Sequence, residues 1–86
     1  MDKFKLEMIT WKDHWGRQEG GWLALDHVPE PQPAIMKTVG WVIKENKDCI
    51  LVSPDIDTGV LDNQVKSNHE QLILKSCVVS RKKIKA

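Results

Sequence analysis

The chain alternates apolar and polar residues with a period of two over several short segments. Residues 4–8 alternate strictly between apolar and charged side chains, and the phase shifts by one residue at Ile9. Strict alternation is typical of a half-buried strand, and a phase shift of this kind is typical of a β-bulge or of a strand that leaves the sheet. We therefore expect a first strand over residues 4–11.

The strongest strand pattern covers residues 35–45. One face of this strand carries Met36, Thr38, Gly40 and Val42. A glycine within a strand indicates a bend or a close approach of another backbone. A polar segment follows at residues 45–48, and a second β-rich run follows at residues 49–53, so the two runs predict a hairpin.

The last third of the chain predicts two more strands around a single turn. Residues 70–75 form one apolar run, residues 75–78 the turn, and residues 79–85 a short final strand. This ending is typical of SH3-like barrels, and curling also protects the edges of a small antiparallel sheet. We predict one all-β domain over residues 1–86: a small antiparallel SH3-like or partly open β-barrel of about five strands with two long loops.

The two predicted loops cover residues 12–34 and 54–68. The first contains three glycines and three prolines, and long loops of this kind in compact domains are usually functional or contain a short strand. Trp15, Trp22 and Leu25 are large enough to hold the first loop against the sheet. In the second loop, Val60 and Leu61 are the apolar residues that we expect to anchor it.

Composition indicates one small core. The chain has 86 residues, of which 41% are hydrophobic and 29% charged, and a domain of this size hides only about 60–65% of its unfolded surface. No apolar run approaches the roughly 20 residues of a membrane span, and no apolar segment of a signal peptide is visible. Cys49 and Cys77 have apolar neighbours and no C-x-x-C spacing, so we expect reduced, buried thiols.

The charges nearly cancel, with a formal net charge of +1, but a basic cluster lies at the end of the chain. Its members are Arg81, Lys82, Lys83 and Lys85. Cations along a final strand could follow a phosphate backbone. They could equally protect an edge strand from aggregation, and the small net charge favours this second role.

Tryptophans are the sharpest chemical feature. Three of the four lie within residues 11–22, and their aromatic faces can stack on bases, cations or a partner's side chains. In the alternative interpretation, Trp11 and Trp41 are core residues, and Trp15 and Trp22 plug the open end of the barrel. The predicted binding site consists of Trp15, Trp22, Asp13, His14 and, as a partner for an anion, Arg17.

The residues that catalysis or metal binding would require are scattered. A structural zinc site needs about four Cys or His ligands with paired spacing, whereas His14, His27 and His69 are far apart. No glycine-rich phosphate loop is present, and Cys77, the thiol nearest to His69, is followed by two valines. We expect no enzyme activity, no metal and no cofactor.

Three segments together resemble a group of small proteins encoded by bacteriophages and prophages, most of which have no assigned function. The segments are residues 9–13 (ITWKD), 38–45 (TVGWVIKE) and 72–81 (LILKSCVVSR), so the resemblance extends over both ends and the centre of the chain. The resemblance implies a small β fold and a phage origin, and it provides no catalytic residue. Many members carry a proline where this chain has Lys75, Ser76 and Cys77, which indicates a shifted turn.

These observations predict a non-enzymatic phage accessory protein in the host cytoplasm. We expect it to bind and neutralise a host factor, either a host protein or a small nucleotide-like ligand such as a defence signal. A nucleic-acid-binding module and a virion or assembly component are the alternatives. A fold that places the tryptophans and the basic cluster on one surface would favour nucleic-acid binding.

Overall fold

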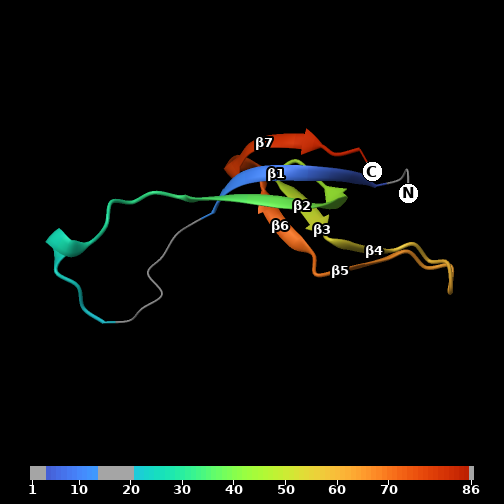
Figure 1. The fold of residues 1–86 in the computed structure, drawn as a ribbon, viewed down its shortest axis with the longest axis horizontal. Coiled ribbons are helices and arrows are strands. Elements are labelled where there is room, and N and C mark those ends of the chain that lie inside the picture. Colours follow the sequence, from blue (N-terminus) through green and yellow to red (C-terminus); the bar gives the residue numbers. More distant parts are fainter. Residues whose placement is uncertain (1–3, 14–20, 86) are drawn as a thin grey trace.

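A computed structural model describes residues 4–13 and 21–85 of the chain. In this part, seven strands form two antiparallel sheets (Figure 1). The main sheet contains β1 (Lys5–Asp13), β2 (Ala34–Glu45), β3 (Cys49–Ser53), β6 (Gln71–Leu74) and β7 (Val78–Lys83). The second sheet contains β4 (Asp55–Asp57) and β5 (Lys66–Asn68), and two short 3₁₀ helices are η1 (Leu25–His27) and η2 (Lys75–Cys77).

The strands of the main sheet lie in the order β6-β3-β2-β1-β7. The helix η2 carries the chain from β6 at one edge to β7 at the other, which is the predicted strand–turn–strand ending. The all-β fold and the five-stranded antiparallel sheet are therefore confirmed. The sheet is not closed into a barrel, so β6 and β7 each have an edge that no strand of the described part pairs with.

One face of the main sheet carries a thin apolar core. Its buried members are Ile9, Trp11, Ile50, Val52 and Ile73, and Val42 and Val78 pack against them. Trp11 lies across from Met36 in the β1–β2 register, and its indole N–H donates to Thr38 Oγ1 at 2.9 Å. The core position that the alternative interpretation gives to Trp11 is confirmed, and its polar nitrogen is satisfied. Trp41, which the same interpretation places in the core, is only half-buried.

The glycine in β2 permits a close approach of β3. A Cβ atom at Gly40 would lie 2.5 Å from Val52 Cγ1 and 2.9 Å from the carbonyl oxygen of Ser53. Side chains do not tolerate such distances, and the Ser53 oxygen belongs to the backbone, which cannot rotate away. The close approach predicted from the sequence at this position is confirmed.

Residues 54–68 differ from the prediction. They form an antiparallel hairpin of β4 and β5 that projects from the sheet, and Val60 and Leu61 at its end are 83% and 99% exposed. The expectation that these two residues anchor a loop is wrong. The base of the hairpin is held instead by the buried Ser53 hydroxyl, whose oxygen lies 2.7 Å from the carbonyl oxygens of both Asp55 and Asn68.

The molecule is elongated, with dimensions of 57 × 25 × 22 Å and a radius of gyration of 17.3 Å. A compact chain of this length has a radius of gyration of about 12 Å. The difference comes from two projections at opposite ends of the sheet (Figure 1). We call residues 21–33, between β1 and β2, the arm, and residues 55–68 the β4–β5 hairpin.

Cys49 and Cys77 are both free thiols, as expected. Each is half-buried, however, so the expectation of fully buried thiols is wrong: Cys49 precedes the buried Ile50 on β3, where successive side chains point to opposite faces, and Cys77 lies in η2, which has no buried residue. Neither short 3₁₀ helix in the described part has the length or apolar character of a membrane-spanning helix.

Replacing Gly40 by alanine tests the close packing of β2 on β3. We expect Gly40→Ala to lower the free energy of unfolding by about 1–3 kcal/mol, because the new methyl group overpacks this contact. Chemical denaturation measures the change, with Ser80→Ala on the exposed part of β7 as the control. An unfolding free energy for Gly40→Ala that equals the control would contradict the close approach.

Candidate functional site

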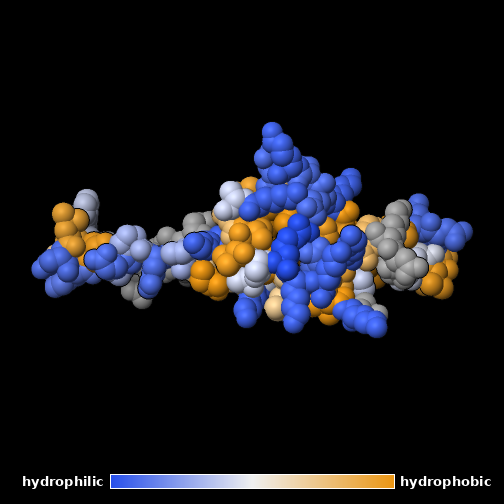
Figure 2. All heavy atoms as spheres, turned by 90° about the horizontal axis from the view of Figure 1, so that it is seen from above, coloured by the Kyte–Doolittle hydropathy of each residue, from blue (hydrophilic) through white to orange (hydrophobic). Residues whose placement is uncertain are grey.

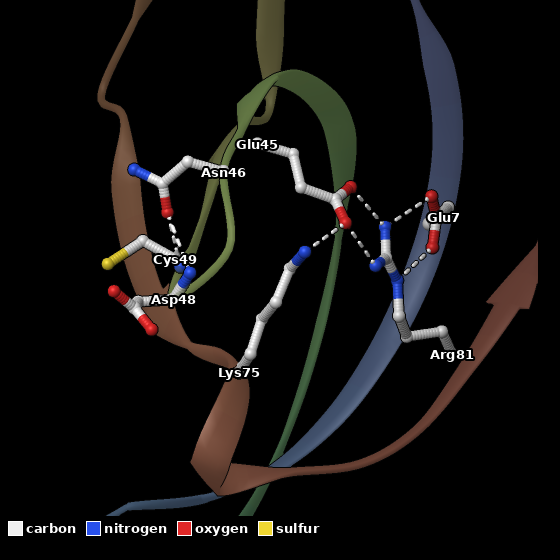
Figure 3. A network of polar contacts seen from close by, with 7 residues as sticks. All are labelled: Glu7, Glu45, Asn46, Asp48, Cys49, Lys75 and Arg81. Atoms are coloured by element: carbon white, nitrogen blue, oxygen red, sulfur yellow. Dashed lines mark hydrogen bonds and ion pairs between the residues drawn. The ribbon is translucent and has the colours of Figure 1, made fainter.

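A network of charged side chains crosses one end of the main sheet (Figure 3). Arg81 of β7 donates to both oxygens of Glu7 on β1, from Nε at 2.7 Å and from Nη2 at 2.9 Å. It also donates to both oxygens of Glu45 at the end of β2, each at 2.9 Å. Bidentate pairs of this kind combine charge with fixed geometry, so one guanidinium joins three strands.

The sheet register explains why Arg81 reaches Glu7. Ile9 is paired with Arg81 and Glu7 with Lys83 in the antiparallel β1–β7 ladder, so these side chains share the face of the sheet that carries the core. Glu7 is only 4% exposed. A buried carboxylate is costly unless a cation and hydrogen bonds compensate it, and Arg81 provides both.

Glu45 has a second cationic partner. Lys75, the first residue of η2, places its ammonium group 2.8 Å from Glu45 Oε2. The hydrogen bond from Arg81 and then that from Lys75 lower the pKa of Glu45 from 4.5 to about 2. The same contacts, with Glu45 first and Glu7 second, raise the pKa of Arg81. We call Glu7, Glu45, Lys75 and Arg81 the clamp.

The turn beside the clamp is held by an asparagine. The Asn46 side-chain oxygen accepts the backbone N–H groups of Asp48 at 2.9 Å and Cys49 at 2.8 Å (Figure 3). The backbone N–H of Lys75 donates to the Asp48 carbonyl at 2.8 Å. These bonds fix the predicted β2–β3 turn and attach η2 to it, which places Lys75 close to Glu45.

A groove lies above the clamp. It consists of a cavity of about 660 Å³ and a second of about 640 Å³ that share Phe4, Ile43 and Lys44. The lining residues that matter for binding are Phe4, Lys5, Val42, Ile43, Lys44 and Lys83. Cavities of this size fall in the range that holds small ligands or peptide side chains.

The charge of the groove is positive. Glu7 and Glu45 are neutralised within the clamp, whereas none of the ion pairs in the described part involves Lys5, Lys44 or Lys83. Glu70, which lines the second cavity and accepts a hydrogen bond from Ser67, is the one further acid among the described residues of the lining. Three ammonium groups therefore surround an apolar lining. An acidic or phosphorylated group attached to an apolar or aromatic body fits this chemistry best.

The arm presents apolar side chains at the opposite end of the sheet. Trp22 is fully exposed, Leu25 is 89% exposed, and Val28 is half exposed. One turn of 3₁₀ helix orders this segment, since the His27 N–H donates to the Ala24 carbonyl at 2.9 Å. Figure 2 shows hydrophobic residues at both ends of the long axis and a mixture of hydrophilic and hydrophobic residues between them.

Of the predicted site residues, the structure describes Trp22 and Asp13. Asp13 ends β1 and is half-buried, where the chain leaves the sheet. Trp22 does not plug the sheet, so that alternative is wrong for this residue, and neither Trp22 nor Leu25 holds the loop against the sheet. The open sheet has no closed end that Trp22 could fill. His14, Trp15 and Arg17 lie outside the described residues.

The basic cluster is divided by the fold. Arg81 and Lys83 face the core side of the sheet, whereas Lys82 is paired with Met8 and points to the other side. Lys85 follows the end of β7. Because β7 is antiparallel to β1, Lys83 lies at the end of the sheet remote from the arm, so Trp22 and the basic cluster are not on one surface.

Sequence reasoning missed the clamp and the groove. Glu7 belongs to the alternating pattern that predicts the first strand, but its burial became visible only when Arg81, 74 residues later, was placed beside it. The one available signal was an acidic residue on the same strand face as Ile9 and Trp11. Phe4, Ile43 and Lys44 gave no signal, because Phe4 is about 40 positions away in sequence from Ile43 and Lys44 of β2.

Among residues 4–13 and 21–85, no group of three or more His, Cys, Asp or Glu side chains could hold a metal ion. No protein-family model, curated protein or solved structure matches the chain. The arm, the groove and the clamp are therefore the features of the molecule that bear on its function.

Removing the cation of the clamp tests the burial of Glu7. We expect Arg81→Met to lower the free energy of unfolding by about 3 kcal/mol, because it leaves a buried carboxylate unpaired. The double variant Glu7→Gln/Arg81→Met should recover part of this loss in urea denaturation. Lys82→Met, on the other side of β7, should change stability by about 0.5 kcal/mol or less, and equal losses for Arg81→Met and Lys82→Met would contradict the clamp.

The pKa of Glu45 predicts a specific loss of stability in acid. Since the pKa of Glu45 is lowered in the folded protein, its ion pairs with Arg81 and Lys75 stabilise the fold above pH 4.5. They lose this effect as the pH falls towards 2. Glu45 is one-third exposed, so we expect the contribution to be about 1–2 kcal/mol after solvent screening.

Unfolding free energies measured across this pH range should fall less for Glu45→Gln than for the wild type. Glu30→Gln on the arm, remote from Arg81, is the matched control and should keep the wild-type pH dependence. Identical pH profiles for Glu45→Gln and the wild type would show that the clamp does not stabilise the folded state.

Proposed function

We propose that this protein is a non-enzymatic binding protein that docks its arm onto another protein chain. The observation that carries the proposal is the full exposure of Trp22 at the end of a projecting segment. Exposing a tryptophan to water is unfavourable, and Trp is among the residues most often found as binding anchors. Leu25 and Val28 add apolar area beside it.

The arm is built for docking at a low entropic cost. Pro29, Pro31 and Pro33 follow the apolar segment, and proline-rich segments are semi-rigid and extended. A segment that is already ordered loses less conformational freedom on binding. The prolines also explain why the arm leaves the sheet: they lack the N–H groups that would continue the β1–β2 ladder.

The balance of apolar surface supports a binding role. Thirteen large apolar side chains are exposed in the described part of the chain, whereas five are buried in the core. Single exposed residues are ordinary, but Trp22, Leu23, Leu25 and Val28 are close in sequence on one segment. Such a group marks an interaction site.

In the phage setting that the sequence resemblance implies, the partner would be a host protein that is blocked or a component of an assembly. The elongated shape favours a role in assembly over the capture of a small nucleotide. Nucleic-acid binding has less support, because Arg81 is already engaged by two carboxylates and the remaining lysines of the basic cluster lie on different sides of β7.

Truncation of the arm anchors tests this function. We expect Trp22→Ala/Leu25→Ala to weaken partner binding by about 30-fold or more, as is common for an aromatic anchor. Its melting temperature should stay within about 2 °C of the wild type, because both side chains are exposed in the isolated chain. Binding is measured by capture from infected host cells with quantitative mass spectrometry.

Leu61→Ala is the matched control, since Leu61 is equally exposed but lies on the β4–β5 hairpin. This variant should capture the same proteins as the wild type. Capture that depends on Leu61 and not on the arm, or an arm variant that loses stability together with binding, would overturn the proposal.

A further inference from the structure

The arm and the groove lie at opposite ends of the same two strands. The arm begins beyond Asp13 at the end of β1, whereas the groove lies beside Lys5 at its start. A strand of nine residues is about 30 Å long. The tip of the arm and the groove of one chain are thus separated by the length of the sheet (Figure 1), and a contact between them requires two chains.

The arm is acidic as well as apolar. From residue 21 to residue 36 the chain contains Asp26 and Glu30 and neither lysine nor arginine. Both carboxylates lie close in sequence to Leu25 and Val28. A binding site whose chemistry matches the arm would be an apolar cavity with basic side chains at its rim.

The groove has these properties. Phe4, Val42 and Ile43 supply the apolar lining, while Lys5, Lys44 and Lys83 supply positive charge. Glu7 and Glu45 do not oppose an acidic occupant, because Arg81 and Lys75 already neutralise them. The third acid of the lining, Glu70, belongs to the second cavity, and the three lysines outnumber it. The chain therefore presents both an acidic apolar projection and a basic apolar groove, and complementary charge of this kind selects partners and sets register.

We infer that the arm of one copy docks in the groove of the next, so that the protein assembles head to tail. Trp22 and Leu25 enter against the apolar lining, and Asp26 and Glu30 lie beside the groove lysines. The inference rests on the proposed function and deepens it, because it names a second copy of this chain as the partner of the arm. Since the two surfaces differ, such contacts build rings or filaments.

The first measurement is the mass of the full-length protein in solution. Sedimentation velocity and light scattering from about 1 μM to several hundred μM cover dissociation constants in the micromolar range. We expect species larger than a dimer that grow with concentration and shrink with added salt, because the groove lysines contribute to the contact. A wild-type protein that stays monomeric, or stops at a dimer, would overturn head-to-tail assembly.

Variants on each surface identify the contact. We expect Trp22→Ser/Leu25→Ser on the arm to be monomeric, and Lys44→Glu/Lys83→Glu in the groove likewise. Mixed in equal amounts, the two variants retain one intact arm and one intact groove, so they should form a dimer that grows no further. Lys82→Glu, on the other side of β7, is the control for a charge reversal outside the groove and should assemble as the wild type does.

Exchanging the charges of the arm and the groove should restore assembly, a result that a misfolded variant would not give. Adding Asp26→Lys/Glu30→Lys to the groove variant gives a chain with a basic arm and an acidic groove, and copies of this variant should assemble with one another. Circular dichroism should show that every variant keeps the strand spectrum. Oligomers that survive both the arm and the groove variants would overturn this interface. A monomeric wild type that still captures another protein through Trp22 would overturn the second copy as partner while leaving the proposed function intact.

Discussion

The contact on which the structure depends is the bond between Arg81 and two carboxylates that come from different parts of the chain. Glu7 is buried beside the apolar core, so the fold requires a cation at this point. Arg81 supplies it from the last strand and also holds Glu45, to which Lys75 of η2 is bound. The clamp thereby fixes β7, η2 and the end of β2 together, and it forms the neutral floor of the groove.

A thin core accounts for the rest of the architecture. Few apolar side chains are buried on one face of a sheet that does not close, and the exposed large apolar residues lie on the arm, on the β4–β5 hairpin and on the strands β2, β6 and β7 of the main sheet. These two projections lie at opposite ends of the long axis. The groove lies at the end of the sheet away from the arm, so the binding surfaces are distributed along the molecule rather than gathered in one pocket.

The strands of the main sheet could be predicted because alternation and β-rich runs are local signals. The role of Gly40 could be predicted because a glycine within a strand indicates a bend or a close backbone approach. The β4–β5 hairpin could not be predicted, since its strands have three residues each and are mostly polar. The exposure of Trp22 depends on whether the sheet closes, which no local pattern determines. In the clamp, Arg81 bonds to Glu7, which is 74 positions away in the sequence, and to Glu45, which is 36 positions away. Only the register of β1 with β7 brings these residues together.

The environment of the Trp22 ring is the most direct test of an arm that is presented for docking. Acrylamide quenching and the indole N–H exchange rate report this environment, with Trp22→Phe used to assign its signal among the four tryptophans. We predict that Trp22 is open to quencher and solvent in dilute protein and becomes shielded when a partner binds, while Trp11, bonded to Thr38, is shielded throughout. A Trp22 ring that is already shielded in the dilute monomer, or that stays open in the complex, would contradict this account.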